Sequence, residues 1–508
     1  MTMFRTLPAL LLAFVLAHAA TAADLTPTGP YRVGFHVRQQ YDRARVYQHA
    51  RSPVTAQLTN SDRARPLQTL VWYPAIGTGG VMFYRDYATT VATEEEFSRT
   101  PEQVRRATDL LIDARAGGAD GAQVQREMRN PVRALRDAPE RPGKFPVVIY
   151  APSNSAYAIE NTDLCEYLAS HGYIVIATPS LGVRSHTVAA DLESAEAQAA
   201  DIGFLVGYAH TLPQADASRI AVVGHSWGSL ASVLAAARDD RIRALVTLDG
   251  SLRAASDYVN GGPRAARYVS PERLGIPLLY MTRLQDEGTI GTELLARIRY
   301  TDVYLATLDA ANHMAFSSWS LRMAPDAAFT GGTRPQAAQA YGAMAETVER
   351  FLDARLKGDA AARRQLDEAL GAQRPPAGFL SFAVRRAASA PPTLDTFLDQ
   401  LGQQGFEHIG TIYDRLHAQN PDLVLDPLQT YDWGMKLLRE RHAADAMRVF
   451  QLGVHLYPER FEFLYDGLGQ ACEAVGERAA AIAYYRKALA LEPTQAHAGE
   501  RLKALGVL

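Results

Sequence analysis

The chain is poor in cysteine: Cys165 and Cys472 are its two thiols, and more than three hundred residues separate them. So few thiols exclude a disulfide-stapled scaffold, and the lack of a C-x-x-C pair excludes dithiol exchange. The two cysteines fall in regions that we expect to form different domains. We therefore predict two free, buried thiols rather than a bridge.

Signatures of cofactor-dependent enzymes are missing as well. The sequence contains no G-x-x-x-x-G-K-[ST] and no H-E-x-x-H. The residues that P-loop nucleotide hydrolysis and zinc-dependent hydrolysis require are therefore absent from it. The glycine-rich stretch at 77–80 lacks the spacing of a dinucleotide-binding loop and is interpreted as a turn. We expect no metal and no organic cofactor.

Charge of one sign is not in excess either. Fifty-two Lys and Arg against 55 Asp and Glu leave a net charge of −3 on 508 residues, so no global field draws the protein to nucleic acid or anionic lipid. With 47% hydrophobic residues, the chain is long enough for two or three packed domains. A small-molecule substrate is the expected partner.

Long apolar runs are confined to the N-terminus. Arg5 precedes an apolar run from Leu7 to Ala17, which is too short to cross a bilayer, and Ala20-Thr21-Ala22 has the small-x-small form that signal peptidase accepts. This pattern predicts a signal peptide over residues 1–23 and an exported protein, periplasmic or secreted. No later run reaches the roughly 20 apolar residues of a membrane helix, so no span is expected after cleavage.

The C-terminal region repeats itself with an offset of 35 residues. Its spacing of glycine, aromatic and small residues resembles the tetratricopeptide repeat, a pair of helices packed through small residues. The pattern predicts units at about 427–460 and 462–495, then a capping helix at 496–506. The matched pairs are Gly434 with Gly469, Leu437 with Cys472, Ala446 with Ala481, Phe450 with Tyr485, Gly453 with Ala488, and Pro458 with Pro493.

A linker is predicted at Pro391-Pro392. It separates a helical domain over 390–508, whose segment from Leu394 to Leu428 could be a degenerate first repeat, from a larger domain over 24–389. Helical repeats present surfaces suited to a peptide or protein, so a protein partner is expected for the helical domain.

The larger domain alternates β-rich runs with helix-period segments, which favours an α/β fold with a doubly wound, mainly parallel sheet. An edge strand is expected at Leu67 to Tyr73, followed by an inserted helical segment over 80–143. There Thr100 and Gln103 form a capping box that predicts a helix start, interpreted as a surface excursion rather than the cover of a site. The other predicted strands are Pro146 to Tyr150, Tyr173 to Thr178, Arg219 to Gly224, Ala244 to Leu248, Pro277 to Met281 and Val303 to Leu308.

A nucleophile is predicted at Ser226. The segment Gly224-His225-Ser226-Trp227-Gly228 follows an apolar strand and precedes a helix of small residues. A serine on a sharp strand-to-helix turn is held in strained backbone, and glycines two residues to either side leave room for it. The turn exposes the hydroxyl and aims the helix N-terminus at the oxygen that becomes anionic in acyl transfer.

A serine nucleophile needs a base, and the chain order of this fold places a histidine after the last strand. His313 fits, because it follows the predicted strand at Val303 to Leu308. Of the other histidines, His225 lies within the turn and points the wrong way. His171 is interpreted as a turn residue, and His186 lies on a loop where it could touch substrate.

Three positions are candidates for the acid that orients the imidazole. Asp249 directly follows the strand after the nucleophile. Asp286 or Glu287 follows the next strand, where many hydrolases of this fold place theirs. Asp309 lies only four residues before His313 and is better suited to begin a turn. We prefer Asp249.

The motif at 224–228, the segment at 168–175 and Leu248-Asp249 resemble the platelet-activating-factor acetylhydrolase and dienelactone-hydrolase-like branch of the α/β-hydrolases. In the acetylhydrolases the acid follows the strand after the nucleophile, so the resemblance favours Asp249. Those enzymes usually carry His-Gly after their third strand, whereas here the chain reads Tyr150-Ala151-Pro152-Ser153-Asn154-Ser155. The backbone amides of Ser153 and Trp227 are expected to form the oxyanion hole, because Pro152 has no N–H.

These patterns predict an exported serine hydrolase that cleaves carboxylic esters with Ser226, His313 and Asp249. A peptidase or thioesterase is an alternative, since the fold and the triad are shared among acyl substrates. A second alternative is a non-catalytic, repeat-bearing binding protein.

Overall fold

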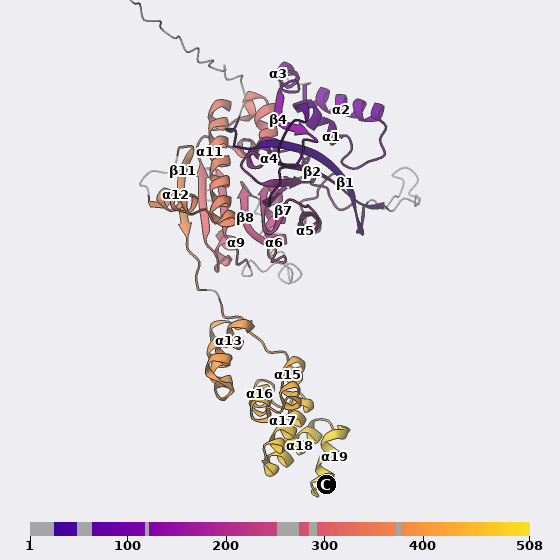
Figure 1. The fold of residues 1–508 in the computed structure, drawn as a ribbon, viewed down its shortest axis with the longest axis vertical. Coiled ribbons are helices and arrows are strands. Elements are labelled where there is room, and N and C mark those ends of the chain that lie inside the picture. Colours follow the sequence, from indigo (N-terminus) through magenta and orange to yellow (C-terminus); the bar gives the residue numbers. More distant parts are fainter. Residues whose placement is uncertain are drawn as a thin grey trace, which may run out of the picture. The chain divides into compact units, whose positions relative to one another are not determined.

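The computed structural model describes residues 25–47, 63–116, 121–250, 274–283, 292–371, 377–389 and 391–508. The chain divides into two compact units, Met1–Ala388 and Ser389–Leu508, just before Pro391-Pro392 (Figure 1). The signal peptide predicted at 1–23 lies outside the described residues.

One mixed sheet of eleven strands organises the first unit, in the order β11-β10-β9-β8-β7-β5-β6-β2-β1-β4-β3 among the residues described. Six neighbouring strands in this order, β10-β9-β8-β7-β5-β6, pair in parallel. Each corresponds to one of the strands predicted for the middle of the domain. Their bounds are Phe145–Ala151 (β5), Ile174–Ala177 (β6), Ala215–His225 (β7), Ile242–Leu248 (β8), Leu278–Arg283 (β9) and Val303–Leu308 (β10).

The prediction of an edge strand at Leu67 to Tyr73 is wrong. These residues belong to β2 (Arg63–Ala75), which lies inside the sheet between β6 and β1 (Arg32–Tyr47) and is antiparallel to both. From Arg65 onward β2 is buried without interruption, as expected for a strand covered on both faces. The sequence concealed its neighbour, because the second half of β1 is rich in polar, solvent-facing residues.

The insertion predicted as helical over 80–143 is helical only in part. Helices α1 (Tyr84–Val91), α2 (Pro101–Ala116) and α3 (Gly121–Glu127) lie between two short strands, β3 (Gly80–Phe83) and β4 (Pro131–Arg136), which extend the sheet beyond β1. At the start of α2 the capping box forms as predicted: the Thr100 amide donates to Gln103 Oε1 at 2.8 Å, and the Gln103 amide donates to Thr100 Oγ1 at 3.3 Å. At the opposite edge, β11 (Phe379–Arg385) pairs with β10.

Helices cover both faces of the sheet (Figure 1). One hydrophobic cluster joins the strands to α4 and α11, and a second joins them to α5 and α6. Along β5, Val148 belongs to the first cluster, whereas Val147 and Ile149 belong to the second, because successive side chains of a strand point to opposite faces. The other α-helices among the described residues of this unit are α4 (Thr162–Ser170), α5 (Leu192–Ala209), α6 (Trp227–Ala236), α9 (Thr292–Arg297), α10 (Ser318–Met323), α11 (Arg334–Leu352) and α12 (Ala360–Gly371).

The second unit is helical. In each expected repeat a glycine of one helix faces an aromatic ring of the next: a Cβ at Gly434 would lie 2.4 Å from the Phe450 ring, and a Cβ at Gly469 would lie 2.6 Å from the Tyr485 ring. Packing this close accounts for the recurrence of both residue types. The helices are α13 (Leu394–Gln404), α14 (Ile409–Gln419), α15 (Pro427–Arg439), α16 (Ala443–Leu456), α17 (Glu462–Ala474), α18 (Arg478–Leu491) and α19 (Ala496–Ala504).

The prediction for the two cysteines is confirmed, because Cys165 and Cys472 are both buried and unpaired. In the part of the chain that the structure describes, no helix has the length and apolar character needed to cross a bilayer.

Candidate active site

Ser226 lies on a strained turn between β7 and α6. Its backbone has φ 52° and ψ −116°, a conformation that a residue with a side chain adopts only when its surroundings enforce it. A Cβ at Gly228 would lie 2.1 Å from the Ala151 carbonyl oxygen, and one at Gly224 would lie 2.6 Å from the backbone of Gly228. Both glycines of the motif are therefore required by close backbone approach. The Ser226 amide donates to the Leu248 carbonyl at 2.9 Å, which ties the turn to the end of β8.

Asp249 and His313 meet at this same edge of the sheet. Asp249 follows β8, and its amide donates to the Met281 carbonyl at 2.9 Å. His313 is the first residue of a short 3₁₀ helix (His313–Phe316), which follows β10 and is capped by Asn312. The Nδ1 of His313 lies 2.5 Å from Asp249 Oδ2. This contact fixes the imidazole and leaves Nε2 for proton transfer, which is the relation of acid to base in a serine-hydrolase triad.

The environment of Asp249 keeps its carboxyl ionised. Burial works to raise its pKa, but the hydrogen bond with His313 and the charges of Arg283 and His225 outweigh burial, so the pKa lies below the ordinary value. The Nε of Arg283, at the end of β9, is 3.6 Å from Asp249 Oδ2. Arg283 was not predicted from the sequence, since nothing local marks a strand-end arginine as the neighbour of an acid on the adjacent strand.

The other candidate acids and histidines lie as follows. Asp286 and Glu287 fall outside the described residues. Asp309 is exposed, and among the described contacts its amide bonds to Gly378 while its carboxylate does not meet His313. His171 ends α4 and contacts the Tyr167 carbonyl through Nδ1 at 2.8 Å. His186 Nε2 contacts the Ser155 carbonyl at 3.0 Å, beside the pocket described below rather than in it.

A buried pair, Glu160 and His225, lies next to His313 and was missed in the sequence. Glu160 Oε1 is 3.2 Å from His225 Nδ1, and the His225 ring stacks on that of His313 with centroids 4.9 Å apart. Burial works to lower the pKa of His225, but the negative charges of Glu160 and Asp249 raise it above 6.5. Burial works to raise the pKa of Glu160, yet His225 and Ser153 hold it below the ordinary value. Each partner therefore favours the charged form of the other.

The same glutamate engages the turn after β5. Glu160 Oε2 accepts from the Tyr150 hydroxyl at 2.8 Å and from the Ser153 amide at 3.0 Å, and Oε1 accepts from the Ser153 hydroxyl. The prediction that the Ser153 amide helps to form an oxyanion hole is therefore not met, because that N–H points to Glu160. Trp227 is the first residue of α6, where helix amides have no partner within the helix.

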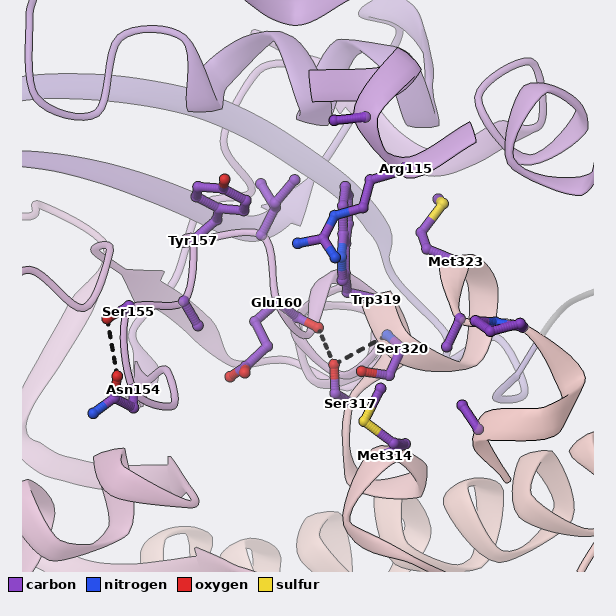
Figure 2. A pocket seen from close by; sticks show the side chains of 16 residues that line it. Arg115, Asn154, Ser155, Tyr157, Glu160, Met314, Ser317, Trp319, Ser320 and Met323 are labelled. Carbon is purple, nitrogen blue, oxygen red and sulfur yellow. Dashed lines mark hydrogen bonds between the residues drawn. The ribbon is translucent and has the colours of Figure 1, made fainter. Parts of the chain in front are cut away.

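A pocket of about 520 Å³ opens beside these residues (Figure 2). Its lining includes Met314, the residue after His313, as well as Glu160 and Asn154, the residue after Ser153. The rest of the lining comes from two segments: Tyr157 and its neighbours after β5, and the stretch from Ser317 to Ala328 around α10. Ala114 and Arg115 of α2 also line it. The inserted helix, interpreted from sequence as a surface excursion, thus borders the pocket.

The chain is similar to one known protein family and to solved structures. A family model described as Chlorophyllase matches residues 115–268, less than a third of the chain, and the matched part contains Ser226 and Asp249. Among solved structures, the chain is similar to a ferulic acid esterase from Streptomyces cinnamoneus, at 20% identity and a TM-score of 0.45, over 67% of this chain and 93% of that one. No curated protein matches the chain in sequence. The family match supports a carboxylic ester hydrolase.

Proposed function

We propose that the protein is a serine hydrolase in which Ser226, His313 and Asp249 cleave carboxylic esters through an acyl-enzyme. The observation that carries the proposal is the 2.5 Å contact between His313 Nδ1 and Asp249 Oδ2, made at the sheet edge where the strained turn presents Ser226.

The reaction proceeds in two half-reactions. Ser226 Oγ attacks the carbonyl carbon while His313 Nε2 takes the hydroxyl proton. The bond from that carbon to the alcohol oxygen then breaks, and His313 returns the proton to the departing alcohol. Water, deprotonated by His313, attacks the acyl-enzyme in the same way, and the acid leaves as Ser226 recovers its proton. Throughout, Asp249 stabilises the imidazolium.

The oxyanion formed in each half-reaction needs two donors in place before the reaction begins. We assign one to the Trp227 amide at the N-terminus of α6, where the helix dipole also favours negative charge. The second is assigned to the Asn154 amide, which follows Ser153 in the turn after β5. Glu160 holds that turn through the Ser153 amide and hydroxyl.

Three finer assignments belong to the proposal. The position of Asp249 after β8 favours the acetylhydrolase and dienelactone-hydrolase-like branch. The apolar N-terminal run favours export by a signal peptide over residues 1–23. The paired helices of residues 427–495, with glycine against an aromatic ring in each pair, favour tetratricopeptide repeats that bind a peptide or protein partner.

An active-site label tests the central claim. A fluorophosphonate probe should modify the full-length protein at Ser226, and the S226A variant should remain unlabelled. Parallel assays with ester, thioester and peptide anilide substrates distinguish an esterase from the thioesterase and peptidase alternatives. Equal ester turnover by S226A and the parent protein would overturn the mechanism, whereas no turnover by either protein would favour the non-catalytic alternative.

A further inference from the structure

The pocket beside the triad presents flat apolar surfaces. The rings of Tyr157 and Trp319 meet nearly edge to face, with centroids 6.4 Å apart at 77°, and the thioethers of Met314 and Met323 line the same space (Figure 2). Aromatic rings favour edge-to-face or offset contacts with other rings, and thioether sulfur packs well against ring edges. These walls favour a flat, aromatic occupant.

The size of the pocket suits a bulky occupant. Its volume of about 520 Å³ falls within the roughly 300–1,000 Å³ of sites that hold drug-sized ligands. An acetyl or methyl group would leave most of this space empty. The volume therefore favours a bulky part of the substrate as the occupant.

Among the described residues, two charged side chains line the pocket, and one of them has an ion-pair partner there. Glu160 is paired with His225 and accepts hydrogen bonds from Tyr150 and Ser153. Arg115, in the last turn of α2, has no ion-pair partner among the residues described, and its guanidinium carbon lies 6.0 Å from the centre of the Trp319 ring. Figure 2 shows Arg115 alongside Trp319, reaching into the space that the rings enclose.

We propose that this pocket selects esters in which an aromatic ring carries a carboxylate on the side away from the scissile bond. The ring lies against Tyr157, Trp319 and the two methionines, and the carboxylate pairs with Arg115, whose planar fork suits a carboxylate. This inference rests on the proposed function, because it takes the pocket as part of the site of Ser226.

A pair of matched substrates tests the selectivity. Monomethyl terephthalate carries the distal carboxylate, and methyl 4-carbamoylbenzoate replaces it with a neutral amide of the same shape. For each variant the ratio of kcat/KM between the two is measured, so that differences in intrinsic reactivity cancel between variants. We expect Arg115→Gln to lower the ratio about tenfold or more, and Arg115→Lys to restore part of it.

Arg105→Gln is the matched control, because Arg105 is an exposed cation on the same helix that does not line the pocket. It should leave the ratio at the parent value. If Arg115 serves only to stabilise the C-terminus of α2, Arg115→Gln lowers both rates together, the ratio stays constant, and the proposal is overturned.

Binding separates this inference from the catalytic proposal. Monomethyl terephthalate is titrated calorimetrically into the full-length S226A variant and into S226A/R115Q. We expect binding to S226A that weakens about tenfold when Arg115 is also replaced. Equal affinities, or no binding to either protein, would refute the pocket assignment even if fluorophosphonate labelling establishes Ser226 as the nucleophile.

Discussion

Replacing Glu160 with glutamine removes the carboxylate that contacts His225 and nearly preserves the side-chain volume. The amide can still accept from Tyr150 and the Ser153 amide through its oxygen. Its NH₂ group then faces the Ser153 hydroxyl, which can turn to accept, and His225 Nδ1, which can accept only if the imidazole is neutral. Glu160→Gln is therefore tolerated while His225 is neutral and is costly once His225 is protonated.

The sign of the pH dependence follows from the raised pKa of His225. In the parent protein, protonation of His225 adds stability that is fully present below the ordinary imidazole pKa of 6.5 and is lost as the pH rises through the higher folded-state pKa. In the Glu160→Gln variant, the carboxylate that favoured the protonated imidazole is gone. Burial then lowers the pKa of His225, so protonation of this residue opposes folding. Near pH 8 we expect Glu160→Gln to lower the free energy of unfolding by about 1 kcal/mol, the net value of a hydrogen bond. Near pH 5 we expect the decrease in the free energy of unfolding to be about 3–5 kcal/mol, the cost of an unpaired buried charge.

Urea unfolding at the two pH values measures this difference. Three of the four tryptophans, Trp72, Trp227 and Trp319, lie in the first unit, so intrinsic fluorescence reports mainly on it. The E160Q/H225Q double variant is the control. Because it has no imidazole at position 225, it should not show the additional destabilisation at low pH. Equal destabilisation by Glu160→Gln at both pH values would refute the assignment of a charged pair.

Four further outcomes are expected. Ser226→Ala should lower kcat roughly 10⁴-fold or more with little change in melting temperature, since the hydrogen bonds described for Ser226 are made by its backbone amide and carbonyl; parent-like turnover would exclude it as nucleophile. Asp249→Asn should cost about 10⁴-fold in kcat and Asp286→Asn far less, and the reverse ranking in steady-state assays would move the acid to the next strand. Gly228→Ala should destabilise by about 3 kcal/mol or more, because its Cβ would lie 2.1 Å from a carbonyl oxygen; an unchanged urea midpoint would contradict this packing. A fragment of residues 24–390 should keep its turnover on small soluble esters while losing partner binding, and an insoluble or inactive fragment would favour one integrated protein.

Much of the candidate site could be predicted from sequence because its signals are local. The turn at Ser226 needs glycine at two fixed positions, and the strand and the helix that flank it are directly adjacent in the sequence. Asp249 and His313 each follow a recognisable strand, and parallel strands present their carboxyl ends at one edge of the sheet. Strand order then brings these ends together with little freedom.

Features that depend on neighbours distant in sequence escaped prediction. The position of β2 could not be read from its own residues, because the strand that covers it, β1, is polar along its second half. The direction of the Ser153 amide depends on where the Glu160 carboxylate lies. The role of α2 in bordering a pocket depends on how the insertion folds back toward α10, and a capping box specifies only where a helix begins.

The sequence by itself determined which residues carry reactive groups and the backbone strain that exposes Ser226, because periodicity, turn chemistry and glycine spacing act over a few residues. Only the tertiary structure decided which charges neutralise one another. Glu160 pairs with His225 across 65 residues, whereas Arg115, which lines the same pocket, has no ion-pair partner in the part of the chain that the structure describes. The physical reason is that the pKa of a buried group depends on desolvation and on charges a few ångströms away, and those neighbours come from separate elements that only the folded chain brings together.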